Sequence, residues 1–284
     1  MYNKALKQIA AGEELSFAAA LQLASAARES DDSLRQLLAA ADRLRRRQHG
    51  ASFDLCSIIN ARSGKCSENC KFCAQSAHYD VAVENYNLVD GEKAVALALE
   101  NEAAGVKRFS LVTAGHHVSS RDLQSQFAPL YRQLRQQTAM SLCASMGFLT
   151  KERAELLFAM GVRRYHCNLE ACRSYFPEVC TTHSWEEKVE TLQIARAAGM
   201  ELCSGGILGI GESFRQRLEL AFELRQLGVD SVPLNILMPI KNTPFAALIP
   251  ISKRDVLIAV AMFRLILPDA VIRIAGGRNH LGNE

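Results

Sequence analysis

Three closely spaced cysteines carry the clearest chemical signal in this 284-residue chain. Cys66, Cys70 and Cys73 form a C-x3-C-x2-C array just after Ser63 and Gly64. A loop with cysteines at this spacing can wrap around an iron–sulfur cluster, for which thiolates are the preferred ligands. Three ligands leave one iron of a four-iron cluster without a protein bond. A structural zinc site is the alternative, but it normally takes four ligands in paired knuckles, so the array favours a cluster.

A second group of cysteines falls within the expected strands. Cys143, Cys167 and Cys203 lie in three different strands, and Arg273 lies in a fourth. In a β/α barrel, inward residues of neighbouring strands converge on the axis, and the active site lies at the C-terminal strand ends. One such cysteine alone is usually a small apolar core residue. Three at comparable depth, together with an arginine, indicate a shared site.

The pattern of the remaining chain predicts an α/β fold of the (β/α)-barrel type that positions these residues. Short apolar runs alternate with helical stretches from residue 57 onward, which is typical of a parallel sheet covered by helices. Ser184 and Glu187 form a capping box at one helix start. The expected strands are Cys56–Asn60, Arg108–Thr113, Ser141–Ala144, Arg164–Asn168, Glu201–Ile207, Ser231–Leu237 and Val271–Ala275. The expected helices are Glu92–Ala104, Arg121–Gln137, Lys151–Met160, Trp185–Ala198, Phe214–Leu227 and Lys253–Leu267.

Residues 1–50 have a different pattern from the barrel domain that we assign to residues 51–284. Their apolar positions recur at helical spacing and predict two amphipathic helices packed beneath the barrel. Seven strands are countable, and the sequence stops soon after the seventh. A closed eight-stranded barrel needs a further helix and strand. We therefore expect either C-terminal truncation or an unusually short member of its fold.

Composition excludes several partners. The 33 Lys and Arg residues exceed the 30 Asp and Glu residues by only three, which argues against a nucleic-acid partner. No apolar run is long enough to span a bilayer, so no membrane partner is expected. Nine cysteines without a secretory signal indicate a reducing cytoplasm, where thiols bind metals rather than pair.

The cysteine array resembles the signature of radical S-adenosylmethionine enzymes, which also place an aromatic residue, here Phe72, before the third cysteine. The string NARSGKCSENCKFCAQSAHY, from Asn60 to Tyr79, is similar to that of the biotin synthase family in particular. The resemblance runs from about Asp54 to Arg278 with matches in several separate places.

This resemblance implies a [4Fe-4S] cluster on Cys66, Cys70 and Cys73, whose open iron chelates S-adenosylmethionine. Transfer of one electron would cleave the sulfonium to methionine and a 5′-deoxyadenosyl radical. That radical would take hydrogen from C9 and then C6 of dethiobiotin.

The resemblance also implies an auxiliary cluster, [2Fe-2S] or larger, that donates the inserted sulfur. The family holds it with three cysteines and an arginine, and Cys143, Cys203 and Arg273 match three of these ligands by local context. The remaining position is Ser110, and a neutral hydroxyl is a poor ligand for iron. We expect Cys167, on the fourth strand, to provide the third thiolate. The alternative is a cluster held by two cysteines together with Ser110 or Arg273.

The cofactor and substrate contacts follow from the same resemblance. The segment Gly205-x-Ile207-x-Gly209-x-x-Glu212 is similar to an adenosyl-binding turn, where glycine lets a flat ring approach the backbone. Glu170 suits two ribose hydroxyls, although it could equally be a solvated loop residue. The amide of Asn235 offers a donor and an acceptor to a cyclic urea. The expected contacts are Phe72, Thr113, Asn168, Glu170, Gly205, Ile207, Gly209 and Glu212 for the cofactor, and Asn168 and Asn235 for the substrate.

The sequence therefore indicates a sulfur-inserting radical enzyme, with a flavodoxin or ferredoxin as electron donor and a homodimer as the expected assembly. A hydrogenase maturase or another radical enzyme of this fold is one alternative, and a catalytically inactive iron–sulfur protein is another. Three further cysteines match no family position. We expect Cys56 to be a core residue, and Cys172 and Cys180 to be exposed thiols on a loop at the barrel mouth.

Overall fold

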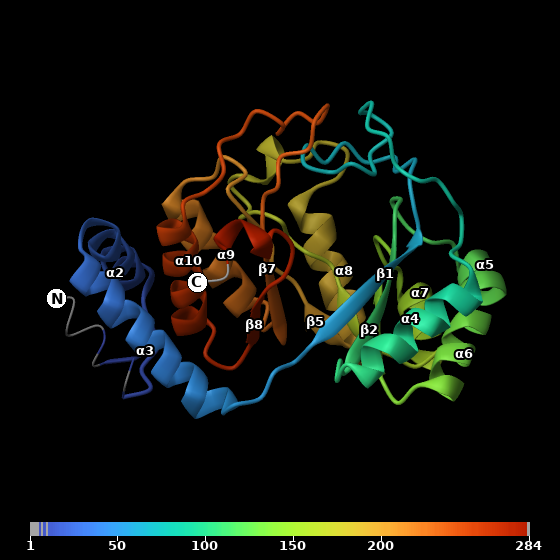
Figure 1. Cartoon of the computed structure of the whole chain (residues 1–284), viewed down its shortest axis with the longest axis horizontal. Coiled ribbons are helices and arrows are strands. Elements are labelled where there is room, and N and C mark those ends of the chain that lie inside the picture. The colour runs from blue at the N-terminus through green and yellow to red at the C-terminus, as the bar shows by residue number, and fades with distance from the viewer. Residues whose placement is uncertain (1–5, 7, 10, 283–284) are drawn as a thin grey trace.

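A curled parallel sheet forms the centre of the molecule, with helices along its outer side (Figure 1). The computed structural model describes residues 6, 8, 9 and 11–282. Its strands are β1 (Cys56–Arg62), β2 (Arg108–Thr113), β3 (Ser141–Ser145), β4 (Val162–His166), β5 (Glu201–Cys203), β6 (Gly206–Leu208), β7 (Ser231–Ile236) and β8 (Val271–Ile274). The helices of the barrel are α4 (Gly91–Ala103), α5 (Ser120–Asp122), α6 (Ala128–Gln137), α7 (Lys151–Ala159), α8 (Trp185–Ala197), α9 (Phe214–Gln226) and α10 (Lys253–Ile266).

The predicted alternation of strands and helices is confirmed, with two local differences. The strand expected over Glu201–Ile207 is split into β5 and β6, because Gly205 lies against strand β7. A Cβ atom on Gly205 would come within 1.9 Å of the carbonyl oxygen of Pro233, so only glycine fits there. The helix expected over Arg121–Gln137 contains a π-helical turn, Leu123–Phe127, between α5 and α6.

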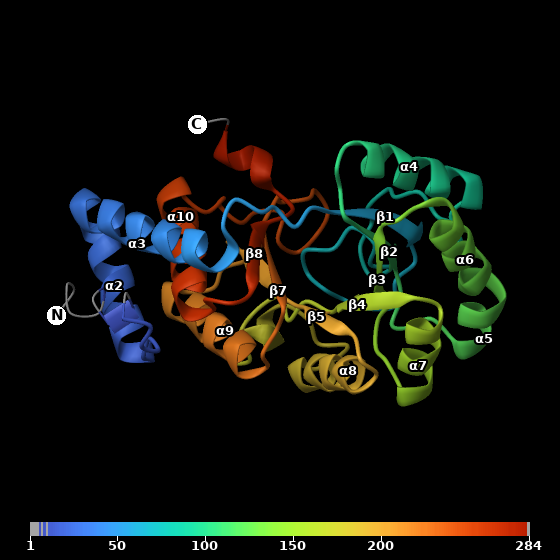
Figure 2. The ribbon, with the colours of Figure 1, turned by 90° about the horizontal axis from the view of Figure 1, so that it is seen from below.

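The sheet is an open, half-barrel arc. Within residues 11–282 the strand order is β1-β2-β3-β4-β5-β7-β6, with β8 also paired to β7, and no pairing joins β8 to β1. All of these pairings are parallel, so the C-terminal strand ends gather at one rim (top of Figure 1). Seen from below, the strands fan out from β1 to β8 inside the row of helices (Figure 2).

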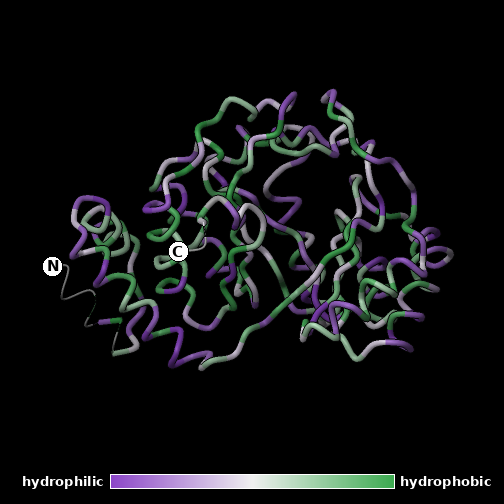
Figure 3. Tube along the Cα trace, in the orientation of Figure 1, coloured by the Kyte–Doolittle hydropathy of each residue, from purple (hydrophilic) through white to green (hydrophobic). Residues whose placement is uncertain are grey.

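Strand periodicity separates a core face from a lumen face. Phe109, Leu111, Leu142 and Tyr165 are at most 2% exposed and pack toward the helices. Successive side chains alternate between faces, so their neighbours in β2, β3 and β4 point toward the barrel axis. Figure 3 shows the corresponding mixture of hydrophobic and hydrophilic residues along each helix, as expected for helices with one face on a sheet. In the described part of the chain, no helix is long and apolar enough to cross a membrane.

Two N-terminal helices, α2 (Phe17–Glu29) and α3 (Asp31–His49), pack against α10 at one end of the molecule (Figures 1 and 2). This position differs from the expected one beneath the barrel. Arg254 of α10 donates two hydrogen bonds to the carbonyl oxygen of Ala27, 3.1 and 2.7 Å long, and pairs with Asp31. These contacts cap the end of α2 with a cation, which opposes the negative end of the helix dipole.

Candidate active site

The cysteine loop lies between β1 and α4 at the rim of the barrel (teal, top of Figure 1). It folds back on itself, since Cys66 N–H donates to the carbonyl oxygen of Gln75 at 2.9 Å and Cys73 N–H donates to that of Cys70 at 3.0 Å. The Gly115 N–H, just beyond β2, donates to the Cys66 sulfur at 3.3 Å. This bond fixes the position of the Cys66 sulfur, and cysteine sulfur is the preferred ligand of iron–sulfur clusters.

A buried carboxylate ties this loop to the segment before α8. Glu68 is 7% exposed and accepts hydrogen bonds from the Ser67 hydroxyl at 3.0 Å, the Thr182 hydroxyl at 2.8 Å and His183 Nδ1 at 2.6 Å. These bonds hold the cysteine loop to a segment more than a hundred residues away in sequence. Sequence reasoning missed this anchor, because Ser67 and Glu68 fill non-cysteine positions of the motif and their partners Thr182 and His183 are distant in sequence.

The segment at the barrel mouth also contains two buried thiols. Cys172 and Cys180 are 1% and 2% exposed, which corrects the expectation that they are exposed loop thiols. The ligand atoms of Cys70, Cys180 and His183 lie within 4.8 Å of one another. Cys180 therefore lies next to the cysteine loop, with its sulfur 3.4 Å from His183 Nδ1.

The predicted adenosyl contacts come together at the mouth. Phe72 and Ile207 belong to one apolar cluster, which also includes Ala171 and Ile210. Glu170 lies at its edge with φ at 68°, and its carbonyl oxygen accepts from Ile207 N–H at 2.9 Å. A carboxylate in a left-handed backbone conformation beside apolar faces could bind a nucleoside, with the rings against Phe72 and Ile207.

Two polar atoms at this mouth lack a protein partner. Within the described residues, Glu170 Oε2 and the Thr113 hydroxyl are buried without a hydrogen bond. Burial raises the pKa of Glu170. Glu170 is therefore not a solvated loop side chain, and buried polar groups of this kind normally require a partner. A bound molecule with hydroxyl and amine donors could provide one.

Glu212 has a different environment from the one expected. Its two oxygens accept from Gly209 N–H at 2.9 Å and from Ile210 N–H at 2.7 Å, and it pairs with Arg217. The carboxylate is thus occupied in shaping the turn after β6. Gly209 itself has φ at 89°, a conformation that favours glycine.

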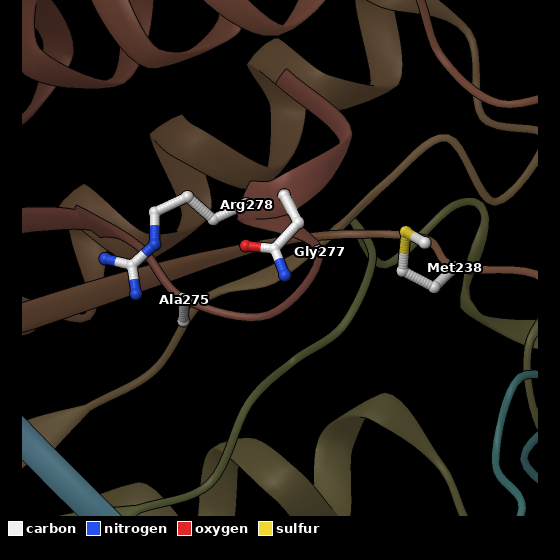
Figure 4. A pocket seen from close by; sticks show the side chains of 5 residues that line it. Met238, Ala275, Gly277 and Arg278 are labelled. Carbon is white, nitrogen blue, oxygen red and sulfur yellow. The ribbon is translucent and has the colours of Figure 1, made fainter. Parts of the chain in front are cut away.

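The two amide side chains contact the backbone near the expected substrate position. Asn168 Oδ1 accepts from Gly205 N–H at 3.2 Å, and Asn235 Oδ1 accepts from Gly276 N–H at 2.9 Å. A pocket of about 320 Å³ adjoins this second contact. In Figure 4, Met238 and Arg278 lie on opposite sides of the pocket, which is also lined by Ala275, Gly277 and Asn279.

A second sulfur group lies inside the barrel. Arg273 Nη2 donates to the Cys203 sulfur at 3.3 Å. The ligand atoms of Cys56, Cys143 and His166 lie within 4.8 Å of one another. This brings the predicted Cys143, Cys203 and Arg273 to the lumen face. It also adds Cys56 and His166, which sequence reasoning had left out.

Cys167 is not part of this second group. It follows His166 directly, so strand alternation turns its side chain to the opposite face. Its thiol packs against the hydrophobic core and lies 4.0 Å from the carbonyl oxygen of Lys188 in α8. The expectation that Cys167 joins Cys143 and Cys203 is therefore not met by the geometry.

An ion-pair network closes the barrel below this group. The Arg164 side chain is 3% exposed and binds Asp54 at 2.9 Å and Glu201 at 2.8 Å. Arg108 binds the same two carboxylates at 3.0 and 3.3 Å. Two cations and two anions thus neutralise one another near the N-terminal strand ends.

Comparison with known proteins places this arrangement in a family. The profile of the Radical SAM superfamily matches residues 61–224, and that of the Biotin and Thiamin Synthesis associated domain matches residues 233–284. A biotin synthase of Desulfotalea psychrophila is 56% identical over 98% of this chain and 82% of its own length. One of Pelotomaculum thermopropionicum is 48% identical over 98% of this chain and 85% of its own. The chain belongs to the biotin synthase family.

Solved structures agree on the fold of this biotin synthase family member. A methylornithine synthase aligns with a TM-score of 0.82 at 18% identity, covering 95% of this chain and 80% of its own. The FeFe-hydrogenase maturase of Carboxydothermus hydrogenoformans aligns with a TM-score of 0.82 at 19% identity, covering 99% of this chain and 67% of its own. The chain is a radical S-adenosylmethionine enzyme of the TIM-barrel type.

Members of this family take a [4Fe-4S] cluster, S-adenosylmethionine and an auxiliary iron–sulfur cluster, and the residues present fit these groups. Cys66, Cys70 and Cys73 share one loop with a donor on sulfur. In the lumen, Arg273 Nη1 and His166 Nε2 are buried without a hydrogen-bond partner among residues 11–282. The inorganic sulfides of an iron–sulfur cluster could accept hydrogen bonds from these two nitrogens.

Proposed function

We propose that this chain converts dethiobiotin to biotin by inserting a sulfur atom between C9 and C6. The clusters and S-adenosylmethionine supply the radical and the sulfur when bound. The chain's own contribution is to hold these groups and the substrate in line and to exclude water. The observation that carries the proposal is the presence of two thiol groups in one barrel. One is on the rim loop and the other is on the lumen face of the sheet.

We assign the rim group to cofactor binding. Cys66, Cys70 and Cys73 would hold the [4Fe-4S] cluster. Phe72 and Ile207, which share an apolar cluster, would enclose the adenine. The support for this assignment is that Glu170 and Thr113, with their unpaired oxygens, lie in the same region.

We assign the lumen group and the pocket near Asn235 to sulfur transfer and substrate binding. Cys143, Cys203 and Arg273 would hold the sulfur-donating cluster. Asn235 and Asn168 would bind the substrate, with the amide of Asn235 directed to the ureido ring. Because Asn235 Oδ1 already accepts from the Gly276 N–H, the orientation of the side-chain amide is set before the substrate binds.

The physiological setting extends this proposal. All nine cysteines are free thiols, which suits a reducing cytoplasm, and a flavodoxin or ferredoxin is the proposed electron donor. We propose a homodimer as the assembly. Light scattering of the purified protein measures its mass, and a mass near the 31.3 kDa of one chain would contradict the dimer.

The activity is tested by anaerobic reconstitution with iron and sulfide, followed by dithionite, S-adenosylmethionine and dethiobiotin. We expect both 5′-deoxyadenosine and biotin, quantified by mass spectrometry. Deoxyadenosine without biotin would instead support a different radical enzyme of this fold. If neither product forms while the cofactor binds, the chain is a catalytically inactive iron–sulfur protein.

A further inference from the structure

The lumen face of the sheet can be followed residue by residue through the strand register. Cys56 in β1 lies opposite Arg108 in β2, and Ser110, two residues later, lies opposite Cys143 in β3. Because residues two apart share a face, Cys56, Ser110 and Cys143 all point to the barrel axis.

The same register continues around the barrel to the arginine. Cys143 lies opposite Arg164 in β4, and His166, two residues later, lies opposite Cys203 in β5. Cys203 lies opposite Ser231 in β7, and Arg273 in β8 lies opposite Pro233, two residues after Ser231. The lumen face therefore carries three thiols, those of Cys56, Cys143 and Cys203.

We propose that Cys56 is the third thiolate ligand of the auxiliary cluster, together with Cys143 and Cys203, and that neither Ser110 nor Cys167 ligates iron. This inference rests on the proposed function, which requires a second cluster in the lumen. Ser110 of β2 lies opposite Ile58 of β1, and Cys56 precedes Ile58 by two residues on the same face. The thiol of Cys56 is therefore one strand away from Ser110 and two residues nearer the N-terminal strand ends.

Distances and chemistry both favour Cys56 over the two other candidates. Its sulfur lies within 4.8 Å of the ligand atoms of Cys143 and His166, so one metal group can contact all three. Ser110 has a hydroxyl where iron–sulfur clusters prefer a thiolate. Cys167 has a thiol, but strand alternation directs it to α8.

The electrostatic surroundings prepare Cys56 for this role. Arg273 of β8 lies on the same lumen face and donates a hydrogen bond to the Cys203 sulfur at 3.3 Å. His166 lies beside the thiols of Cys56 and Cys143, and its Nε2 is buried without a hydrogen-bond partner among residues 11–282. The lumen thus offers the positive charge of Arg273 to an anionic group.

The ligand assignment is tested on the full chain with Cys66, Cys70 and Cys73 all replaced by Ala, so that only the auxiliary cluster remains. After anaerobic reconstitution, iron, acid-labile sulfide, visible absorption and Mössbauer spectra are measured. In this background Cys56→Ala should retain less than about a tenth of the iron and sulfide. Ser110→Ala and Cys167→Ala should retain the full complement and an unchanged spectrum.

A ligand-swap variant separates a lost ligand from a damaged fold. Ser110 lies directly opposite Cys143, so Cys56→Ala combined with Ser110→Cys places a thiol beside the same cluster. This double variant should recover most of the iron and sulfide. Circular dichroism of each cluster-free variant checks folding, and Cys56→Ser replaces Cys56→Ala if the latter is unfolded.

The outcomes distinguish the ligand assignment from the function. A background chain that binds no second cluster at all overturns both. A cluster that survives Cys56→Ala, or one that is lost with Cys167→Ala or Ser110→Ala, overturns the ligand assignment alone and leaves the proposed function standing.

Discussion

In the proposed function, single side chains at the rim hold the cofactor and set its orientation. The rim loop presents its three thiols from one short segment, and Glu170 adds a buried carboxylate with an unpaired oxygen among the described residues. Each of these groups can be removed without altering a helix or a strand. Their roles can therefore be tested by single substitutions.

Replacement of Cys66, Cys70 or Cys73 by Ala, one at a time, should abolish cleavage of S-adenosylmethionine. A four-iron cluster with only two protein ligands is readily lost, whereas the auxiliary cluster should remain because its proposed ligands lie on strands. Chromatography for 5′-deoxyadenosine measures the cleavage of S-adenosylmethionine. Iron analysis measures whether the auxiliary cluster remains. Cleavage at the wild-type rate in any of the three variants would contradict the loop assignment.

Glu170→Gln should weaken the binding of S-adenosylmethionine by about 10- to 100-fold, since a hydrogen bond to a charged group contributes about 1.5–3 kcal/mol. Equilibrium dialysis against the reconstituted, unreduced protein measures the dissociation constant. The matched control is Glu178→Gln, an exposed carboxylate on the same mouth-side segment that lies 3.9 Å from the Lys71 ammonium. Equal affinity of the Glu170 and Glu178 variants would remove Glu170 from the cofactor site.

At the scale of the elements, an ion-pair network links several strands near their N-terminal ends. β2, β4 and β5 each contribute one side chain to the network of Arg108, Arg164 and Glu201, and Asp54 just before β1 completes it. A buried guanidinium requires paired anions, because desolvation of an unpaired charge is costly. The network therefore holds four neighbouring segments in register below the auxiliary site.

Asp54→Asn should lower the free energy of unfolding by about 2 kcal/mol at pH 7, because it leaves Arg164 partly uncompensated. Burial alone would raise the pKa of Asp54, but hydrogen bonds and charges from Arg164 and Arg108 outweigh it and lower the pKa. A carboxyl with a depressed pKa stabilises the fold above its unfolded pKa and loses this contribution as the pH falls through its folded pKa.

The difference between wild type and Asp54→Asn should therefore shrink when urea unfolding is repeated at acid pH, below the usual carboxyl range. Asp32→Asn is the control, since its pair with Arg35 is 3.5 Å long and exposed, and such pairs contribute little. If the difference in unfolding free energy did not change with pH, the charge of Asp54 would not be what stabilises the ion-pair network.

At the scale of the whole molecule, the N-terminal helices and the barrel share one hydrophobic core. Leu23 and Leu37 are fully buried, and they join the same hydrophobic cluster as the strands and α10. The division into residues 1–50 and 51–284 therefore remains a proposal about sequence units. In packing terms the two parts share one continuous core.

Leu37→Ala should lower the free energy of unfolding by about 3 kcal/mol, the usual effect of removing a buried leucine. Urea unfolding followed by circular dichroism should still show one transition, because α3 and α10 are packed together. Leu99→Ala, at a position 41% exposed, should change stability by less than about 0.5 kcal/mol. A separate early transition for residues 1–50 would show that the helices are an independent unit.

The sequence by itself determined the elements and the rim loop of this protein. Helix and strand periods, caps such as Ser184 with Glu187, and the C-x3-C-x2-C spacing are local properties, and the structure confirms the elements that they predict. The cysteine array also indicated the superfamily that the comparisons confirm. Local patterns were sufficient because backbone hydrogen bonds and turn geometry depend on neighbouring residues.

Only the tertiary structure decided which distant side chains share a site. Cys167 and Cys203 look alike in the sequence, but one residue of strand parity directs Cys167 to α8 and leaves Cys203 beside Arg273. Cys56 resembled a core residue until the parallel register placed it on the same lumen face as Cys143, two residues nearer the N-terminal strand ends. The face that a strand residue occupies depends on register, and register is set by long-range packing of the whole barrel rather than by local sequence.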